Sequence, residues 1–150
     1  MGRRVLAVDV GARRVGLAIS DASATLARPL ETLVVASDSD AVDRVADRIA
    51  SLAREDDGLA AIVVGLPVRL DGRASEASAR VRAFIAALAD RTELPIAVED
   101  ERLTSREAES RLAKGERDWR KRKAKLDAAA AAIILQDYLD RTDESGGSGG

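Results

Sequence analysis

An aspartate inside an apolar strand constrains this chain more than any other residue. Asp9 lies in residues 5–10, a run whose other members are apolar and predict a strand buried on both faces. Aspartate is uncommon in strands, and an ionised carboxylate among apolar side chains is costly unless it is paired. Gly11 follows, which puts the carboxylate at the strand's carboxyl end beside a sharp turn. Open α/β sheets bind ligands at such ends, so we expect a cation there.

The amino-acid composition excludes several kinds of chemistry. The chain has 150 residues, 46% hydrophobic and 33% charged, enough for one soluble domain with a real core. It contains no cysteine and no histidine, which excludes disulfides, thiolate or Ser-His-Asp catalysis and ordinary zinc sites. A bound metal would be Mg²⁺ or Mn²⁺, held by carboxylates. No apolar run approaches a membrane span, and we expect a cytoplasmic protein without a membrane partner.

Charge is distributed unevenly along the chain. The formal net charge is −2, yet residues 114–125 carry seven basic and two acidic side chains, a local charge of +5. A basic patch on a mildly acidic protein suits a polyanion bound at one face. A solvated, mobile loop is an equally good interpretation of the same run. Trp119 lies among these bases, where it could stack on a nucleobase or anchor the loop.

Hydrophobic periodicity predicts one mixed α/β sheet with helices on its faces. Two adjacent strands would form a hairpin, and later strands would be joined by helical crossovers. The strands are expected at residues 5–10, 15–20, 30–35, 60–66 and 96–98. The helices are expected from a cap among Asp38, Ser39 and Asp40 to Gly58, from about Ser75, after a Thr104–Glu107 capping box, and over residues 126–140. We expect one domain over residues 1–140, a loop in the basic segment and a disordered Gly/Ser tail over residues 141–150.

Further acids could share a cation with Asp9. Strand alternation places Glu99 and Glu101 on one face of their strand and Asp100 on the other, so only some of them can point where Asp9 points. Asp127 opens the expected last helix, ahead of the wholly apolar residues 128–135. Taken singly, Asp127 is better explained as a helix cap than as a metal ligand. Residues 99–102, taken singly, are better explained as a solvated strand end. Asp9 could instead accept hydrogen bonds from the Gly11 turn or pair with an arginine.

Together these acids predict metal-dependent chemistry. Two or three carboxylates that meet at one end of a sheet repel one another unless cations join them. Paired Mg²⁺ ions roughly 4 Å apart can activate water and stabilise the leaving oxygen in phosphodiester hydrolysis. That reaction needs neither histidine nor cysteine, in agreement with the composition.

Four motifs in this order resemble the YqgF/RuvX family. The first is residues 9–21, DVGARRVGLAISD, and the second is VGLP at residues 64–67 with Asp71-Gly72. The third, DERLTS at residues 100–105, has Ser105 where the family's motif has a second threonine. The fourth is KLDAAA at residues 125–130 with ILQDYL at residues 134–139. The motifs span nearly the whole chain.

The resemblance implies a ribonuclease H-like fold related to the RuvC resolvases, with a mixed five-stranded sheet flanked by helices. In that fold the first three strands are antiparallel and the first is central. The resemblance also implies catalytic acids that bind Mg²⁺ or Mn²⁺, which by position are Asp9, Glu101 and Asp127, with Asp100 as the alternative to Glu101. The implied activity is that of a nuclease which processes the 5′ end of pre-16S rRNA. Resolution of Holliday junctions in DNA is the alternative.

The expected partner is a nucleic acid, either structured RNA or branched DNA. Cations near the acids would hold its backbone, which carries no sequence information. These candidates are Arg13, Arg14, Arg102, Arg117, Trp119, Arg120, Lys121, Arg122, Lys123 and Lys125. A junction resolvase would need a symmetric pair of sites, which would imply a homodimer. Two further alternatives are a nucleic-acid-binding adaptor without catalysis and an ATP-binding domain of the actin and Hsp70 kind.

Overall fold

The strands form one five-stranded mixed sheet. The computed structural model describes residues 2–67, 76–100 and 119–149. The sheet has the order β3-β2-β1-β4-β5, in which β1–β2 and β2–β3 are antiparallel and β1–β4 and β4–β5 are parallel. Its strands are β1 (Arg4–Val10), β2 (Arg14–Ser20), β3 (Ala27–Val34), β4 (Leu59–Leu66) and β5 (Ile96–Asp100). The expected mixed sheet with a central first strand is confirmed.

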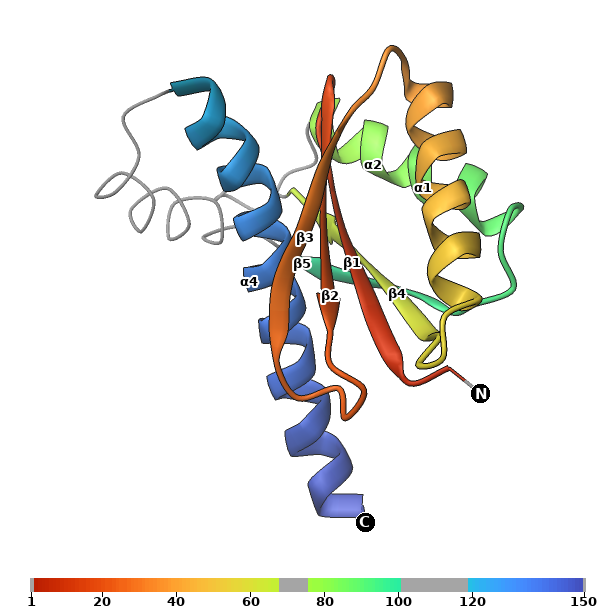
Figure 1. Cartoon of the computed structure of the whole chain (residues 1–150), viewed down its shortest axis with the longest axis vertical. Helices are drawn as coiled ribbons and strands as arrows, with labels where there is room; N and C mark the ends of the chain where they lie inside the picture. The colour runs from red at the N-terminus through yellow and green to blue at the C-terminus, as the bar shows by residue number, and fades with distance from the viewer. Residues whose placement is uncertain (1, 68–75, 101–118, 150) are drawn as a thin grey trace.

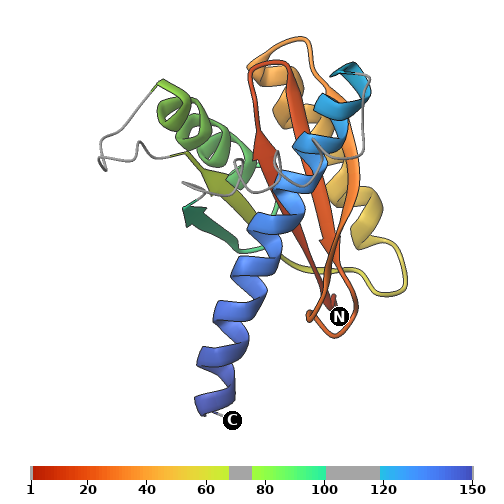
Figure 2. The same cartoon turned by 90° about the vertical axis from the view of Figure 1, so that its left-hand side faces the viewer.

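Helices cover both faces of this sheet. Helices α1 (Asp38–Ala53) and α2 (Glu76–Ala89) lie on one face and α4 (Trp119–Gly149) lies on the other (Figures 1 and 2). Each face has its own apolar cluster, because successive strand side chains point to opposite faces. Leu6 and Val8 of β1 belong to the cluster under α1 and α2. Val5 and Ala7 belong to the cluster under α4.

The boundaries of α1 and β3 differ from the expected ones. Ser37, rather than one of the three expected residues, caps α1: its backbone is extended and its hydroxyl accepts a hydrogen bond from the Asp40 N–H at 3.0 Å. Strand β3 begins at Ala27 and includes Pro29. A proline is tolerated there because β3 is an edge strand, and Pro29 pairs with Ala18 where the register of the ladder shifts.

The largest difference concerns the last helix. Helix α4 begins at Trp119, so the expected loop is wrong for residues 119–125, which are helical. Lysine, arginine and alanine are good helix formers. The loop was predicted from the concentration of charge in this stretch, without regard to that helix propensity. The helix also continues to Gly149, where an unstructured tail was expected. Serine and glycine disfavour helices, and nothing in the structure explains the extension. The expected Thr104–Glu107 capping box and the Asp71-Gly72 turn lie outside the described residues.

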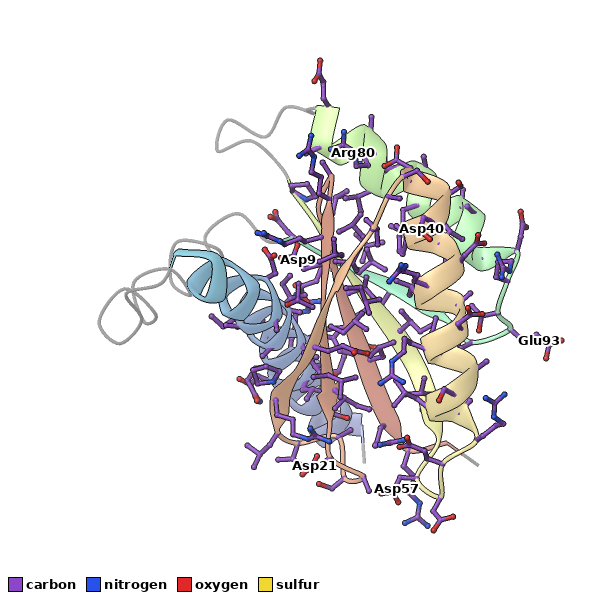
Figure 3. All side chains as sticks on the ribbon, turned by 45° about the horizontal axis from the view of Figure 1, so that its top comes forward. Asp9, Asp21, Asp40, Asp57, Arg80 and Glu93 are labelled. Carbon is purple, nitrogen blue, oxygen red and sulfur yellow. The ribbon has the colours of Figure 1, made fainter. Side chains whose placement is uncertain are left out.

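The turn between β2 and β3 is held together by Asp21, at the opposite end of the sheet from Asp9 (Figure 3). Its carboxylate accepts hydrogen bonds from the N–H groups of Thr25, at 2.8 Å, and Leu26, at 3.2 Å. Gln136 of α4 donates to the Thr25 carbonyl and accepts from the Ala27 N–H, both at 2.9 Å. The turn is thereby fastened to the helix that carries Asp127.

These bonds predict a pH dependence of stability. The Thr25 and Leu26 N–H groups lower the pKa of Asp21, because they favour its ionised form. A carboxyl whose pKa is lower in the folded protein stabilises it above pH about 4, and this contribution is lost as the pH falls through the folded pKa. We expect Asp21→Asn to reduce the stability of the protein near pH 7 and to flatten its fall below pH 4, measured by urea unfolding. Asp56→Asn, at an exposed acid, should keep the wild-type profile.

Candidate functional site

Asp9 faces α4. In β1, Val5 and Ala7 pack against α4, and alternation places Asp9 on the same face. The residue is half-buried near the carboxyl end of the central strand (Figure 3). The Gly11 N–H donates to the Arg14 carbonyl at 2.8 Å, so it serves the hairpin turn rather than the Asp9 carboxylate.

A glycine opposite Asp9 brings α4 down onto the sheet. Gly16 of β2 pairs with Asp9 in the antiparallel ladder, and paired residues have Cα atoms roughly 5 Å apart. A Cβ atom at Gly16 would lie 2.1 Å from the Asp127 carbonyl oxygen and 3.0 Å from the Ala128 nitrogen. Only glycine therefore allows the α4 backbone to approach this closely. The approach places Asp127 beside the strand pair that carries Asp9.

Asp127 is well inside α4 rather than at its start. The helix begins at Trp119, so Asp127 lies in its third turn. The interpretation of Asp127 as a cap or first-turn acid is therefore wrong. Its Oδ2 atom is buried, and the neighbouring Ala128 is 7% exposed. The residue as a whole is half-buried, and helix capping does not explain an acid at this position inside the helix.

The acids at the end of β5 lie on different faces of the sheet. Ile96 packs with the α1–α2 cluster and Ala97 with the α4 cluster, so Glu99 faces α4 and Asp100 faces the other side. Glu99 is 5% exposed and is bound by Arg141 of α4. Asp100, the alternative metal ligand, therefore points away from the face that carries Asp9. Glu101, the preferred ligand, lies outside the described residues.

Strand β4 lies between β1 and β5, so the strands that carry Asp9 and Glu99 are not neighbours in the sheet. Adjacent strands are about 4.8 Å apart, which puts the backbones of β1 and β5 roughly 10 Å apart. Among the described residues, no group of three or more acidic side chains is close enough to hold a metal ion. Asp9 and Asp127 are the two predicted site residues that the described part of the chain brings to one place.

The basic candidates approach the same end of the sheet from two elements. Arg13 is exposed and Arg14 is half-buried, and both belong to the β1–β2 hairpin that starts two residues after Asp9. The first two turns of α4 precede Asp127 on the same helix (Figure 1). They carry Trp119, Arg120, Lys121, Arg122, Lys123 and Lys125. Arg102 and Arg117 lie outside the described residues.

Two residues important to this arrangement were missed in the sequence. Gly16 alternates with apolar residues in the predicted strand, and a glycine inside a strand is a known sign of close backbone approach. Arg141 gave no signal, because a charged residue after an apolar helix is ordinary. Its partner Glu99 did give a signal in the sequence. Glu99 is a charged residue inside a predicted strand, and Asp9 was singled out for the same reason.

The sequence pattern of the RuvX family, described as Holliday junction resolvase, matches residues 3–141. The chain belongs to the RuvX family. It is 41% identical over 136 residues to a protein of Chloroflexus aurantiacus, covering 91% of this chain and 86% of that protein. It is 43% identical over 143 residues to a protein of Clavibacter michiganensis, covering 95% and 86% respectively. Both relatives carry the name "Putative pre-16S rRNA nuclease".

The RuvX assignment agrees with the fold. The structure of RuvC from Thermus thermophilus matches with a TM-score of 0.50 and 19% sequence identity, covering 87% of this chain and 92% of that one. This likeness confirms the ribonuclease H-like arrangement of a mixed sheet flanked by helices. RuvX proteins are nucleases, hydrolases that act on phosphodiester bonds, as the motifs implied. In the part of the chain that the structure describes, no helix has the length and apolar character that crossing a membrane requires.

Proposed function

We propose that this RuvX protein is a divalent-metal-dependent nuclease that cuts precursor rRNA, at a site built around Asp9 and Asp127. The observation that carries the proposal is the close approach at Gly16, which brings the helix bearing Asp127 to the strand pair bearing Asp9. Two acidic residues from distant parts of the chain thus belong to backbones that lie side by side near the carboxyl end of the central strand. Negative charges that lie near one another repel, and a bound cation would offset that cost.

The residues present fit Mg²⁺ or Mn²⁺. Both ions prefer oxygen ligands, and the chain offers carboxylates and no imidazole or thiolate. Asp9 is held by a ladder and Asp127 by a helix, so their backbones are fixed before any ion binds. Glu101, which follows the last described residue of β5, is the proposed third ligand.

When bound, the divalent ion would supply an acidified water and neutralise charge on the phosphate. The chain's own residues then have three tasks. Asp9 and Asp127 would hold the ion in place. Arg13, at the exposed hairpin beside Asp9, contacts the phosphate backbone. The basic residues in the first turns of α4 would supply further contacts to the backbone of the substrate, which orient it without reading its sequence.

The names of the relatives favour RNA as the substrate. Proteins 41% and 43% identical to this chain carry a name that specifies pre-16S rRNA. We therefore propose the 5′ leader of that precursor as the segment removed. The test is cleavage of an RNA that carries this leader, in Mg²⁺ or Mn²⁺, beside a mature-end RNA of equal length. We expect cuts in the leader of the precursor only. Equal cleavage of both RNAs would contradict the proposed specificity.

Resolution of four-way DNA junctions is the second candidate. The family description favours it directly, since it names a Holliday junction resolvase. A resolvase cuts two strands of a junction symmetrically, so it would require two copies of the site and hence a homodimer. A synthetic four-way junction in the same assay separates the two functions. Paired symmetric nicks, with the precursor RNA intact, would establish the resolvase instead of the rRNA nuclease.

A further inference from the structure

A pocket lies between α1 and α2, where these helices flank the carboxyl end of β1. Its volume is about 260 Å³. Val10 of β1, Val42 of α1 and Phe84 of α2 contribute apolar side chains to its lining. Ligands the size of a drug molecule occupy pockets of about 300–1,000 Å³, so the space here suits a single ring system rather than a larger ligand.

Small side chains on α2 leave this space open. The residues of α2 that line the pocket recur at three- and four-residue spacing, so they form one stripe of the helix. They are Arg80, Ala83, Phe84 and Ala87. Both alanines are exposed, and neither side chain extends beyond its Cβ atom, so α2 does not fill the gap to α1 at these positions. A larger side chain in this stripe would therefore occupy the pocket.

The polar groups of the pocket suit the edge of a nucleobase. Arg80 Nε lies 3.5 Å from Asp38 Oδ1, and the two side chains are 38% and 76% exposed. An ion pair this exposed contributes little to stability, so either group can turn to a ligand at low cost. Ser39 adds a hydroxyl to the same lining. Guanidinium groups donate to the acceptors of base edges, and carboxylates accept from their amino groups.

The pocket lies at the end of the sheet where Asp9 lies. Val10 directly follows Asp9, with Cα atoms about 3.8 Å apart across the peptide bond. Val10 packs with the cluster under α1 and α2, whereas Asp9 faces α4. Arg80 and Asp9 both lie toward the end of the molecule opposite Asp21 (Figure 3). A nucleic-acid strand with a phosphate at Asp9 could therefore cross the end of β1 and reach the pocket within a few nucleotides.

We propose that this pocket receives one unpaired nucleobase of the substrate, from a nucleotide near the one that is cut. The base packs against Val10, Val42 and Phe84, and Asp38 and Arg80 bind its edge. Recognition of RNA commonly uses unstacked bases in this way. The inference deepens the proposed function and rests on it, because it requires a nucleic-acid strand at Asp9. It adds a source of sequence preference, which contacts to phosphates do not supply.

The test removes the bases of the substrate one at a time. RNAs that carry the pre-16S 5′ leader are made with a single abasic nucleotide at successive positions, and their binding to Asp9→Asn protein is measured by fluorescence anisotropy. We expect one position at which loss of the base raises the Kd about tenfold, as is typical of a stacked base. In protein that also carries Ala83→Leu, the leucine fills the pocket. Loss of the same base should then leave the Kd unchanged.

Ala86→Leu is the matched control for Ala83→Leu. Ala86 is exposed on α2 and does not line the pocket, so this variant should keep the tenfold effect of the missing base. Ala83→Leu should fold, because the position is exposed and leucine is a good helix former. If it does not fold, Ala87→Leu gives the same comparison, since it adds a leucine to the same stripe.

The same abasic effect in Ala83→Leu as in Ala86→Leu would overturn the inference, and so would the absence of any sensitive position. Either result, with the leader RNA still cut by wild-type protein, would leave the proposed function standing. Wild-type protein that neither binds nor cuts the leader RNA would instead refute the proposed rRNA function, and the base pocket with it.

Discussion

Replacing Asp9 with asparagine should abolish cleavage and leave the fold intact. The change keeps the size of the side chain and removes the negative charge that attracts the ion. Loss of groups outside the coordination sphere already costs about 10–100-fold, so loss of a direct ligand should exceed a hundredfold. The unfolding temperature should stay constant or rise, because the change removes the charge of a half-buried acid on the sheet face under α4. Cleavage rates and thermal unfolding measure the two effects.

Asp47→Asn is the matched control for this variant. Asp47 is exposed on α1, on the other face of the sheet from α4. It removes the same charge from the protein without touching the site, so its cleavage rate should equal that of the wild type. Full activity of Asp9→Asn would contradict the assignment. Equal losses in both variants would show that net charge, rather than metal binding, controls cleavage.

Gly16→Ala should both destabilise the protein and inactivate it. The added Cβ would lie 2.1 Å from the Asp127 carbonyl oxygen, so α4 must move away by roughly 1 Å. The contact is with backbone, which no side-chain rotation can relieve. Overpacking of this kind costs about 1–3 kcal/mol of stability. Displacing a catalytic group by about 1 Å can cost on the order of a hundredfold in rate.

Gly16→Ala and Asp9→Asn test different features of the site, the position of α4 and the charge of a proposed ligand. Gly16→Ala moves Asp127 without changing any acid, so its activity should fall even at temperatures where unfolding shows that the variant is folded. Ala60→Val serves as the control, because it adds carbon atoms at an exposed position of β4. A folded Gly16→Ala variant with wild-type cleavage would mean that the close approach of α4 is irrelevant to the site.

The architecture was accessible from sequence because strong local patterns determine it. The apolar residues 5–10 and 60–66 predicted the central strands, and the alternation at residues 15–20 predicted the half of the hairpin that pairs with β1. Asp9 was identified because a charge in such a strand is costly. The start of α4 was not predicted correctly, because residues 119–125 combine good helix formers with a charge pattern that also suits a loop.

The assembly of the site was less accessible, because it depends on distances between elements. Strand alternation placed Asp100 and Glu99 on opposite faces of β5. It did not show which of these faces is the one that carries Asp9. The order β1-β4-β5 separates strands that the sequence could not place. The role of Gly16 depends on a helix more than one hundred residues later, and Arg141 meets Glu99 at a separation of 42 residues. Local patterns carry no information about such contacts.

The most direct measurement is anomalous diffraction from crystals of the protein soaked in Mn²⁺. The account predicts an anomalous peak within coordination distance of the Asp9 and Asp127 carboxylates, beneath α4, and no peak there in crystals of Asp9→Asn. A peak that persists in Asp9→Asn, or Mn²⁺ bound only away from these two residues, would contradict the account.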